Sequence, residues 1–78
     1  MLDAEDIKVA TFHSHYGAMM FHKRIGGDSE MRPVPRALSS SCGTAVFFTL
    51  PFDEKWTDEN TEAVYEQDGN SWRVIWKR

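Results

Sequence analysis

The stretch "TAVFFTL" at residues 44–50 is the clearest strand in the sequence, and the other elements can be placed around it. β-Branched and aromatic residues fill this stretch, and such residues are enriched in strands. It follows a run of different character, "PVPRALSSSCG" at residues 33–43, whose prolines, serines and glycine are typical of a loop. We therefore expect a β-strand that begins directly after a loop carrying the single cysteine of the chain, Cys42.

Toward the N-terminus, a strand and a helix are expected before this loop. Residues 7–13, "IKVATFH", are rich in strand formers, and Ser14 is placed to cap a helix over residues 15–25. Two glycines follow the helix and end it. Residues 30–34 predict a further strand at a sheet edge, because the prolines there cannot donate hydrogen bonds to a central ladder.

Toward the C-terminus, we expect a second helix and a last strand. Acidic residues within residues 53–67 suit the positive end of a helix dipole, which favours a helix there. Residues 71–77, "SWRVIWK", alternate as a strand. This alternation puts Trp72, Val74 and Trp76 on one face. The order βαββαβ predicts the α+β class with a ferredoxin-like fold: a four-stranded antiparallel sheet in the order 4-1-3-2, with two helices on one face.

Composition restricts the class of protein. A chain of 78 residues supports one small domain, which we place over residues 1–78. No apolar run approaches the length of a membrane span, and a net charge of -3 argues against nucleic acid as a partner. The opening "MLDAEDIK" at residues 1–8 is acidic and lacks the pattern of a secretory signal. We therefore expect a cytoplasmic protein, in which a lone cysteine stays reduced.

The chemistry of Cys42 has two interpretations when the residues are considered alone. A cysteine reacts as its thiolate, which nearby cations and backbone N–H groups favour, and Arg36 and the serines are placed to supply them. Gly43 leaves room beside the sulfur for an approaching group. On the other hand, free cysteines are among the most buried residues, so Cys42 could be a small structural side chain. Composition and spacing leave both interpretations open.

The loop and its flanks resemble a known family. "RPVPRALSSSCGTAVFF" at residues 32–48 looks very like the signature of the family described as putative selenium/sulfur carrier protein-like, and "VATFHSHYGAM" at residues 9–19 is similar to its first strand, serine cap and helix. The resemblance implies that Cys42 is the carrier atom. It further implies a binding loop formed by Pro33, Pro35, Arg36, Ser39, Ser40, Ser41 and Gly43.

The function implied by this resemblance is that of a non-enzymatic carrier. Cys42 would accept sulfur or selenium, as a persulfide or selenosulfide, from a donor enzyme and present it to an acceptor protein, without any cofactor. A protein-interaction or regulatory module with a structural cysteine is the main alternative. A metal site formed by Cys42 with His13, His15 and His22 is a weaker one, and we expect no metal, because the histidine spacing fits capping or solvated positions better.

Aromatic residues suggest a surface for self-association. The chain carries more large aromatic rings than one covered sheet face accommodates, namely Phe12, Phe47, Phe48, Trp72 and Trp76. Helices on one face would leave the other open, so we expect weak homodimerisation through that face. The alternative is that most of these rings lie under the helices.

Overall fold

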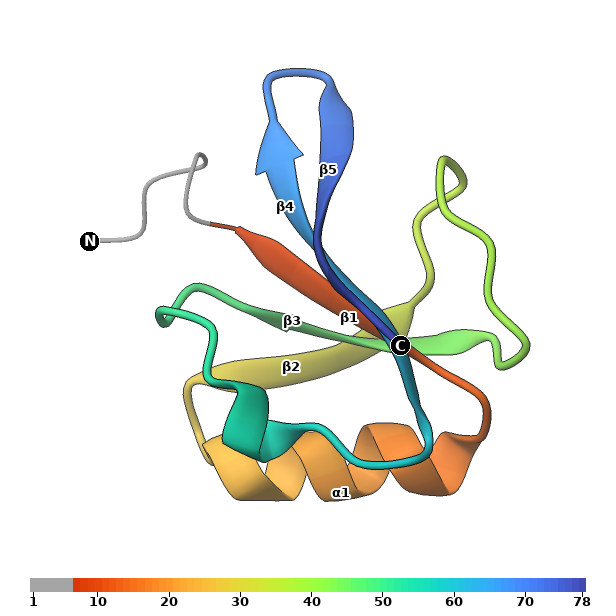
Figure 1. Cartoon of the computed structure of the whole chain (residues 1–78), viewed down its shortest axis with the longest axis vertical. Helices are drawn as coiled ribbons and strands as arrows, with labels where there is room; N and C mark the ends of the chain where they lie inside the picture. The colour runs from red at the N-terminus through yellow and green to blue at the C-terminus, as the bar shows by residue number, and fades with distance from the viewer. Residues whose placement is uncertain (1–6) are drawn as a thin grey trace.

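Within residues 7–78, five antiparallel strands form one sheet, and one α-helix packs against it (Figure 1). The computed structural model describes residues 7–78, so the acidic opening stretch lies outside the described residues except for its last two positions. The elements run in the order β1 (Lys8–Phe12), α1 (His15–Ile25), β2 (Ser29–Pro33), β3 (Thr44–Phe48), η2 (Glu54–Trp56), β4 (Thr61–Asp68) and β5 (Ser71–Lys77). None of the helices in this part of the chain is long and apolar enough to cross a membrane.

The first strand in sequence is the central strand of the sheet. The strand order is β2-β3-β1-β4-β5, and every residue of β1 is buried. Val9 pairs with Phe47 on one side and with Tyr65 on the other. The expected pairing between the strand at Val9 and the strand at Phe47 is therefore confirmed. The strand at residues 30–34 was expected at an edge, and β2 lies at one edge of the sheet.

Helix α1 has the predicted bounds because its caps are local. The Ser14 side chain accepts a hydrogen bond from the Gly17 backbone N–H at 3.2 Å, as an N-cap residue does. The helix ends where Gly26 takes a φ of 93°, a left-handed value that favours glycine. Sequence-local signals of this kind set where the helix begins and ends, whereas its stability comes mainly from the packing of its buried face.

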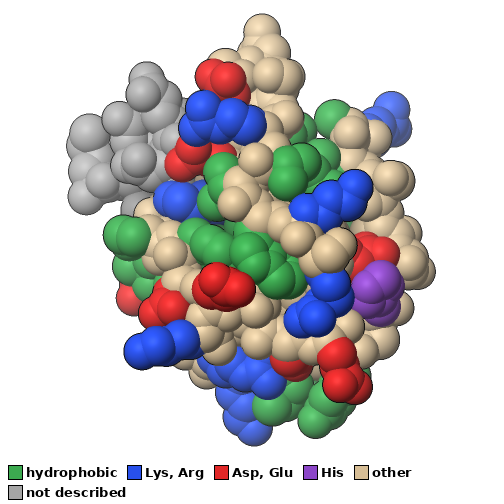
Figure 2. Space-filling view, in the orientation of Figure 1, with side chains coloured by type: hydrophobic (Ala, Val, Ile, Leu, Met, Phe, Trp, Pro, Cys, Tyr) green, Lys and Arg blue, Asp and Glu red, His purple; other side chains and the backbone are tan. Residues whose placement is uncertain are grey.

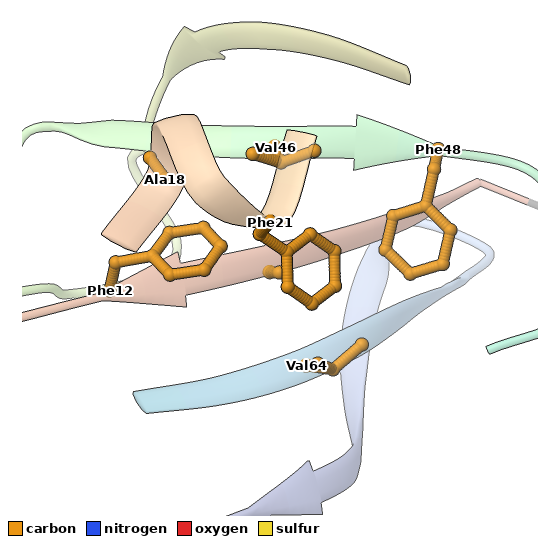
Figure 3. Packing of buried hydrophobic residues seen from close by; sticks show 7 residues of the cluster. Phe12, Ala18, Phe21, Val46, Phe48 and Val64 are labelled. Atoms are coloured by element: carbon orange, nitrogen blue, oxygen red, sulfur yellow. The ribbon is translucent and has the colours of Figure 1, made fainter. Parts of the chain in front are cut away.

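The core lies between α1 and one face of the sheet (Figure 3). Phe21 projects from the helix and is fully buried. Its ring centroid lies 5.3 Å from that of Phe12 and 5.8 Å from that of Phe48, distances at which aromatic rings attract each other. Ala10, Ala18, Val46 and Val64 complete the buried layer. This layer joins the helix to β1, β3 and β4.

Gly17 allows the chain segment before β4 to approach the helix closely. A Cβ atom on Gly17 would lie 2.6 Å from the Asn60 Cβ, closer than real Cβ atoms come. The Asn60 backbone C=O also accepts a hydrogen bond from the His13 N–H at 2.8 Å. The glycine that weakens the first helical turn is thus needed for packing, and this packing brings the start of β4 beside the end of β1.

The predicted ferredoxin-like fold with two helices is wrong. The acidic segment at residues 53–67 does not form a helix: it contains only the short 3₁₀ turn η2, followed by β4. The Asp53 side chain caps η2 by accepting from the Lys55 N–H at 2.9 Å, so acidic residues that suit a helix start serve a single turn instead. Segment Thr61–Asp68 pairs with β1 and β5 on its two sides, and these tertiary partners override its helical appearance.

The last strand has the predicted bounds, and Trp72 and Val74 share a face as expected, but its predicted place in the sheet and the predicted facing of Trp76 are wrong. Strand β5 lies at a sheet edge next to β4, not beside β1, so the order 4-1-3-2 does not hold. Val64 pairs with Trp76, but Tyr65 pairs with Val74, which leaves Ile75 as the extra residue of a β-bulge. Trp76 therefore shares the core face with Val64, whereas Val74 faces the opposite side.

The sheet face away from the helix carries aromatic side chains that are only half-buried. Phe47 and Tyr65 flank Val9 on this face, and the Arg32 guanidinium lies 5.4 Å from the centre of the Phe47 ring. In the orientation of Figure 1, with α1 at the bottom, hydrophobic side chains gather near the centre of the view and acidic and basic side chains surround them (Figure 2). Val74, which pairs with Tyr65, also lies on the sheet face away from the helix. Val74 is 49% exposed. Weak homodimerisation through this face stays a prediction.

Candidate functional site

The cysteine loop, residues 34–43, connects the edge strand β2 to β3 and extends beyond the end of the sheet (Figure 1). Pro33 is the last residue of β2 and pairs with Thr44. One further bond closes the neck of the loop, because the Val34 N–H donates to the Gly43 carbonyl at 3.2 Å. The Leu38 N–H donates to the Pro35 carbonyl at 3.0 Å and forms a turn at the far end of the loop.

Cys42 is half-buried where the loop returns to the sheet. The Thr44 backbone N–H donates to the Cys42 sulfur, with 3.4 Å between nitrogen and sulfur. A backbone donor aimed at sulfur stabilises negative charge on it. The Cys42 N–H in turn donates to the Ser40 hydroxyl oxygen at 3.3 Å. Both the sulfur and the backbone of Cys42 are therefore held by hydrogen bonds.

The serines differ in what they contact. Ser39 is exposed. The Ser40 hydroxyl lies 2.8 Å from Glu62 Oε1, and the Ser41 hydroxyl lies 2.8 Å from Glu62 Oε2. The Ser41 backbone N–H also approaches Glu62 Oε1, at 3.4 Å. Ser40 and Ser41 thus hold the loop against β4. Of the serines, only Ser40 forms a hydrogen bond with Cys42.

Glu62 was not among the residues expected at the site. Burial raises the pKa of its carboxyl, but the hydrogen bonds from Ser41 and Ser40 and the nearby His13 outweigh this effect, so the pKa lies below its ordinary value. His13 Nδ1 lies 3.2 Å from Glu62 Oε2. The carboxylate is therefore charged at neutral pH and satisfied by donors from two segments. The sequence places Glu62 near the loop only if its segment is known to form a strand that pairs with β1.

Arg36 and Gly43 are both open to an approaching molecule. Arg36 is exposed, and within the described residues it makes no hydrogen bond, ion pair or ring contact. The other arginines of that part are engaged, Arg24 with Asp58, Arg32 with Glu30, Arg73 with Glu66, and Arg78 with the Trp76 ring. A Cβ atom on Gly43 would meet no atom within 4 Å, and its φ is not in the left-handed region, so the fold does not require glycine there.

The histidines occupy separate places. His15 Nδ1 lies 3.3 Å from the Thr44 hydroxyl, one residue beyond the loop, and His22 bonds to Ser29 at the other end of the helix. Across residues 7–78, no group of three or more His, Cys, Asp or Glu side chains is arranged to hold a metal ion. His13 and His15 are both exposed and lie near the cysteine loop, where each side chain makes one polar contact.

Two hollows of the surface lie away from the thiol. One of about 450 Å³ lies at the start of β2 and the end of β3, between Asp28, Arg32 and Leu50. Another of about 410 Å³ follows the helix and is lined by Met19, Met20, His22, Lys23, Gly26 and Met31. Neither hollow is lined by Cys42. The sulfur lies half-buried on the loop, apart from these two hollows.

Fold and site together define a small α+β domain that presents one thiol on a fastened loop. The chain belongs to the family described as "Putative Se/S carrier protein-like", whose model matches residues 8–64, well over half of the sequence. The expected resemblance is thereby confirmed. No curated protein and no solved structure matches the chain.

Proposed function

We propose that the protein is a non-enzymatic carrier of sulfur or selenium and that Cys42 is the carrier site. In the sulfur case, the Cys42 thiolate attacks the terminal sulfur of a persulfide on a donor enzyme. A new S–S bond forms on Cys42, the S–S bond of the donor breaks, and the donor thiol leaves with the electron pair. The terminal sulfur moves without net oxidation. Attack by an acceptor thiol on that terminal sulfur then regenerates Cys42.

The observation that carries the proposal is the setting of the sulfur. It is half-buried at the end of the loop, with 3.4 Å between the sulfur and the nitrogen of a backbone N–H donor, and it lines neither of the two hollows described. A carrier needs an accessible sulfur for a partner protein, whereas an enzyme of small molecules usually needs a cavity around its reacting group. The family match supports the same class of function. The reaction requires reduced Cys42, which fits a cytoplasmic location.

Two residues of the loop have roles in this proposal that the fold itself does not need. Arg36 is exposed and unpaired within the described residues, so its guanidinium is free to attract an anionic sulfur or a carboxylate of the donor. Gly43 has open space where a side chain would lie, and this space lets a partner backbone approach the sulfur. Their expected effects are therefore on transfer and not on stability.

The experiment measures sulfur acceptance by intact-protein mass spectrometry. Wild-type protein is incubated with a cysteine desulfurase and cysteine, and the time course of the gain of one sulfur is recorded; a selenium donor is tested in parallel. We expect a gain that a thiol reductant removes, and none in Cys42→Ser. Arg36→Ala and Gly43→Ala should accept sulfur several-fold more slowly while unfolding at the wild-type urea concentration. Lys55→Ala, which removes an exposed cation beyond the loop, is the matched control and should accept sulfur at the wild-type rate.

The carrier proposal fails if wild-type protein with a reduced thiol gains neither sulfur nor selenium from several donors. A Cys42→Ser variant that folds normally would then favour the interaction module with a structural cysteine. A gain of selenium without sulfur, or the reverse, would identify the element that is carried.

A further inference from the structure

Glu62 lies at a break in the pairing between β1 and β4. Thr11 pairs with Ala63 and Phe12 pairs with Thr61, so Glu62 is the extra residue of a β-bulge. Bulges bend a strand and redirect the side chain of the extra residue. Thr61 and Ala63 are buried at 0% and 3% exposure, whereas the Glu62 side chain is 20% exposed and reaches the cysteine loop. The irregularity of the strand therefore aims a carboxylate at the loop.

Nearly all the side-chain hydrogen bonds that hold the loop against the rest of the domain are made with the Glu62 carboxylate. Ser41 bonds to Glu62 through both its N–H and its hydroxyl. The Ser40 hydroxyl lies 2.8 Å from Glu62 Oε1 and 2.9 Å from the Phe12 carbonyl oxygen, but its one proton serves a single acceptor at a time. Within the described residues, no other hydrogen bond joins residues 35–41 to the body of the domain.

The contacts continue from the carboxylate toward the sulfur. The Ser40 oxygen that donates to Glu62 or Phe12 also accepts the Cys42 N–H at 3.3 Å. Cys42 in this position receives the Thr44 N–H on its sulfur. Removing Glu62 releases Ser41 and leaves Ser40 with one acceptor, so Cys42 is then held mainly by the neck of the loop.

We propose that Glu62 is the residue that positions Cys42 for sulfur transfer, by holding the cysteine loop against the β1–β4 pair. The inference rests on the proposed carrier function. Glu62 touches neither the sulfur nor the transferred atom, so it is a positioning residue. Holding a reacting group in one geometry speeds its reaction with a partner that docks in one orientation. A small reagent that approaches from any direction gains nothing from that geometry and is hindered by the half-burial of the sulfur.

The experiment compares Glu62→Ala, Glu62→Gln and the control Glu66→Gln, which removes a carboxylate of the same strand that pairs with Arg73. We expect amide hydrogen exchange at Ser41 and Cys42 in Glu62→Ala to be about tenfold faster than in wild type. Alkylation by iodoacetamide should become a few-fold faster, while sulfur acceptance from the desulfurase should become about tenfold slower. Glu62→Gln keeps one carbonyl acceptor and should recover part of each change, and Glu66→Gln should match wild type.

Unfolded protein would also alkylate faster and accept sulfur more slowly, because the half-buried sulfur would be exposed and the docking geometry lost. Both reactions are therefore compared under conditions in which urea denaturation shows every variant to be folded, so that opposite changes there arise from the loop and not from lost stability. The proposal is overturned if both Glu62 variants exchange and alkylate like wild type, or if wild type and Glu62→Ala accept sulfur equally fast. If no form accepts sulfur while exchange and alkylation change as expected, the carrier function is wrong and the control of Cys42 by Glu62 stands. If Glu62→Ala does not fold, Glu62→Gln is compared with wild type in all three measurements, namely hydrogen exchange, alkylation and sulfur acceptance.

Discussion

The two hairpins of the sheet are connected in opposite ways. Strands β4 and β5 are joined by Gly69 and Asn70 alone, whereas β2 and β3 are joined by the whole cysteine loop, residues 34–43. Gly69 has a φ of 62°, a value suited to a tight hairpin turn. The cysteine loop lacks any residue of positive φ and is held by contacts with Glu62 on a different strand. One connection is determined by local backbone geometry and the other by tertiary contacts.

This difference indicates which residues serve the fold and which serve the site. Two adjacent antiparallel strands need only a short turn, as β4 and β5 demonstrate. The residues of the cysteine loop beyond that minimum add no side chain to the buried core. Their polar groups instead hold Cys42 in place. We therefore expect substitutions in the tight turn to change stability and substitutions in the loop to change transfer.

The largest effect is expected in the core that both hairpins share. Phe21→Ala removes a fully buried ring that contacts Phe12, Phe48 and Trp56. The free energy of unfolding should fall by about 3–5 kcal/mol, which would leave so small a domain largely unfolded. Tyr16→Ala, on the exposed face of the same helix, is the control. Urea denaturation measures both, and an effect below about 1 kcal/mol for Phe21→Ala would contradict the packing described.

The second-largest change in the free energy of unfolding is expected for a glycine of the tight turn, and it is compared with a glycine of the cysteine loop. Gly69→Ala puts a side chain on a left-handed residue and should cost about 1–2 kcal/mol. Gly43→Ala meets open space at a φ outside that region, so its effect on unfolding should stay within about 0.5 kcal/mol. Urea denaturation of both variants measures the contrast. Equal losses would show that the cysteine loop is as locally constrained as the tight turn.

The elements that the sequence predicted correctly are those set by local signals. Ser14 and Gly26 bound the helix, and β-formers mark β1 and β3. Strand β4 was missed because the acidic residues before and within it also suit a helix start. What makes the segment a strand is its position between β1 and β5, and a partner on each side outweighs a weak helical pattern.

The candidate site was predictable only in part for the same reason. The loop residues follow one another in the chain, so their motif could be recognised together with Cys42. Glu62 is twenty positions beyond Cys42, and it meets the loop only because β4 pairs with β1 and bulges at that point. The bulge at Ile75 likewise reversed the predicted facing of Trp76. Such irregularities depend on how strands fit together and have no signature in the alternation of residues.

The fastening of the loop should be sensitive to acid. The pKa of Glu62 is lower in the folded protein than its ordinary value of 4.5. Its carboxylate, which faces His13, Ser40 and Ser41, therefore contributes stability fully above that value, and the contribution is lost as the pH falls through the folded pKa. The free energy of unfolding of wild type should exceed that of Glu62→Gln by about 1 kcal/mol near neutral pH. Near pH 3 the two free energies should not differ measurably. Urea denaturation across this range checks the sign. A difference that grows toward acid would contradict it.

The smallest effect is expected on the tight hairpin, where Glu66 on β4 pairs with Arg73 on β5. Glu66 is the same residue type on the same strand as Glu62, but Arg73 is 63% exposed, so water and salt screen the pair. Glu66→Gln should change the free energy of unfolding by less than about 0.5 kcal/mol, and that small change should disappear at high salt. Urea denaturation at low and high salt measures it. If Glu66→Gln cost as much as Glu62→Gln, the loss would reflect a carboxylate on β4 in general and not the fastening of the cysteine loop. A clear difference between the two glutamates, seen in one strand and in one assay, would instead assign the effect of Glu62 to its own partners, the two serines and His13.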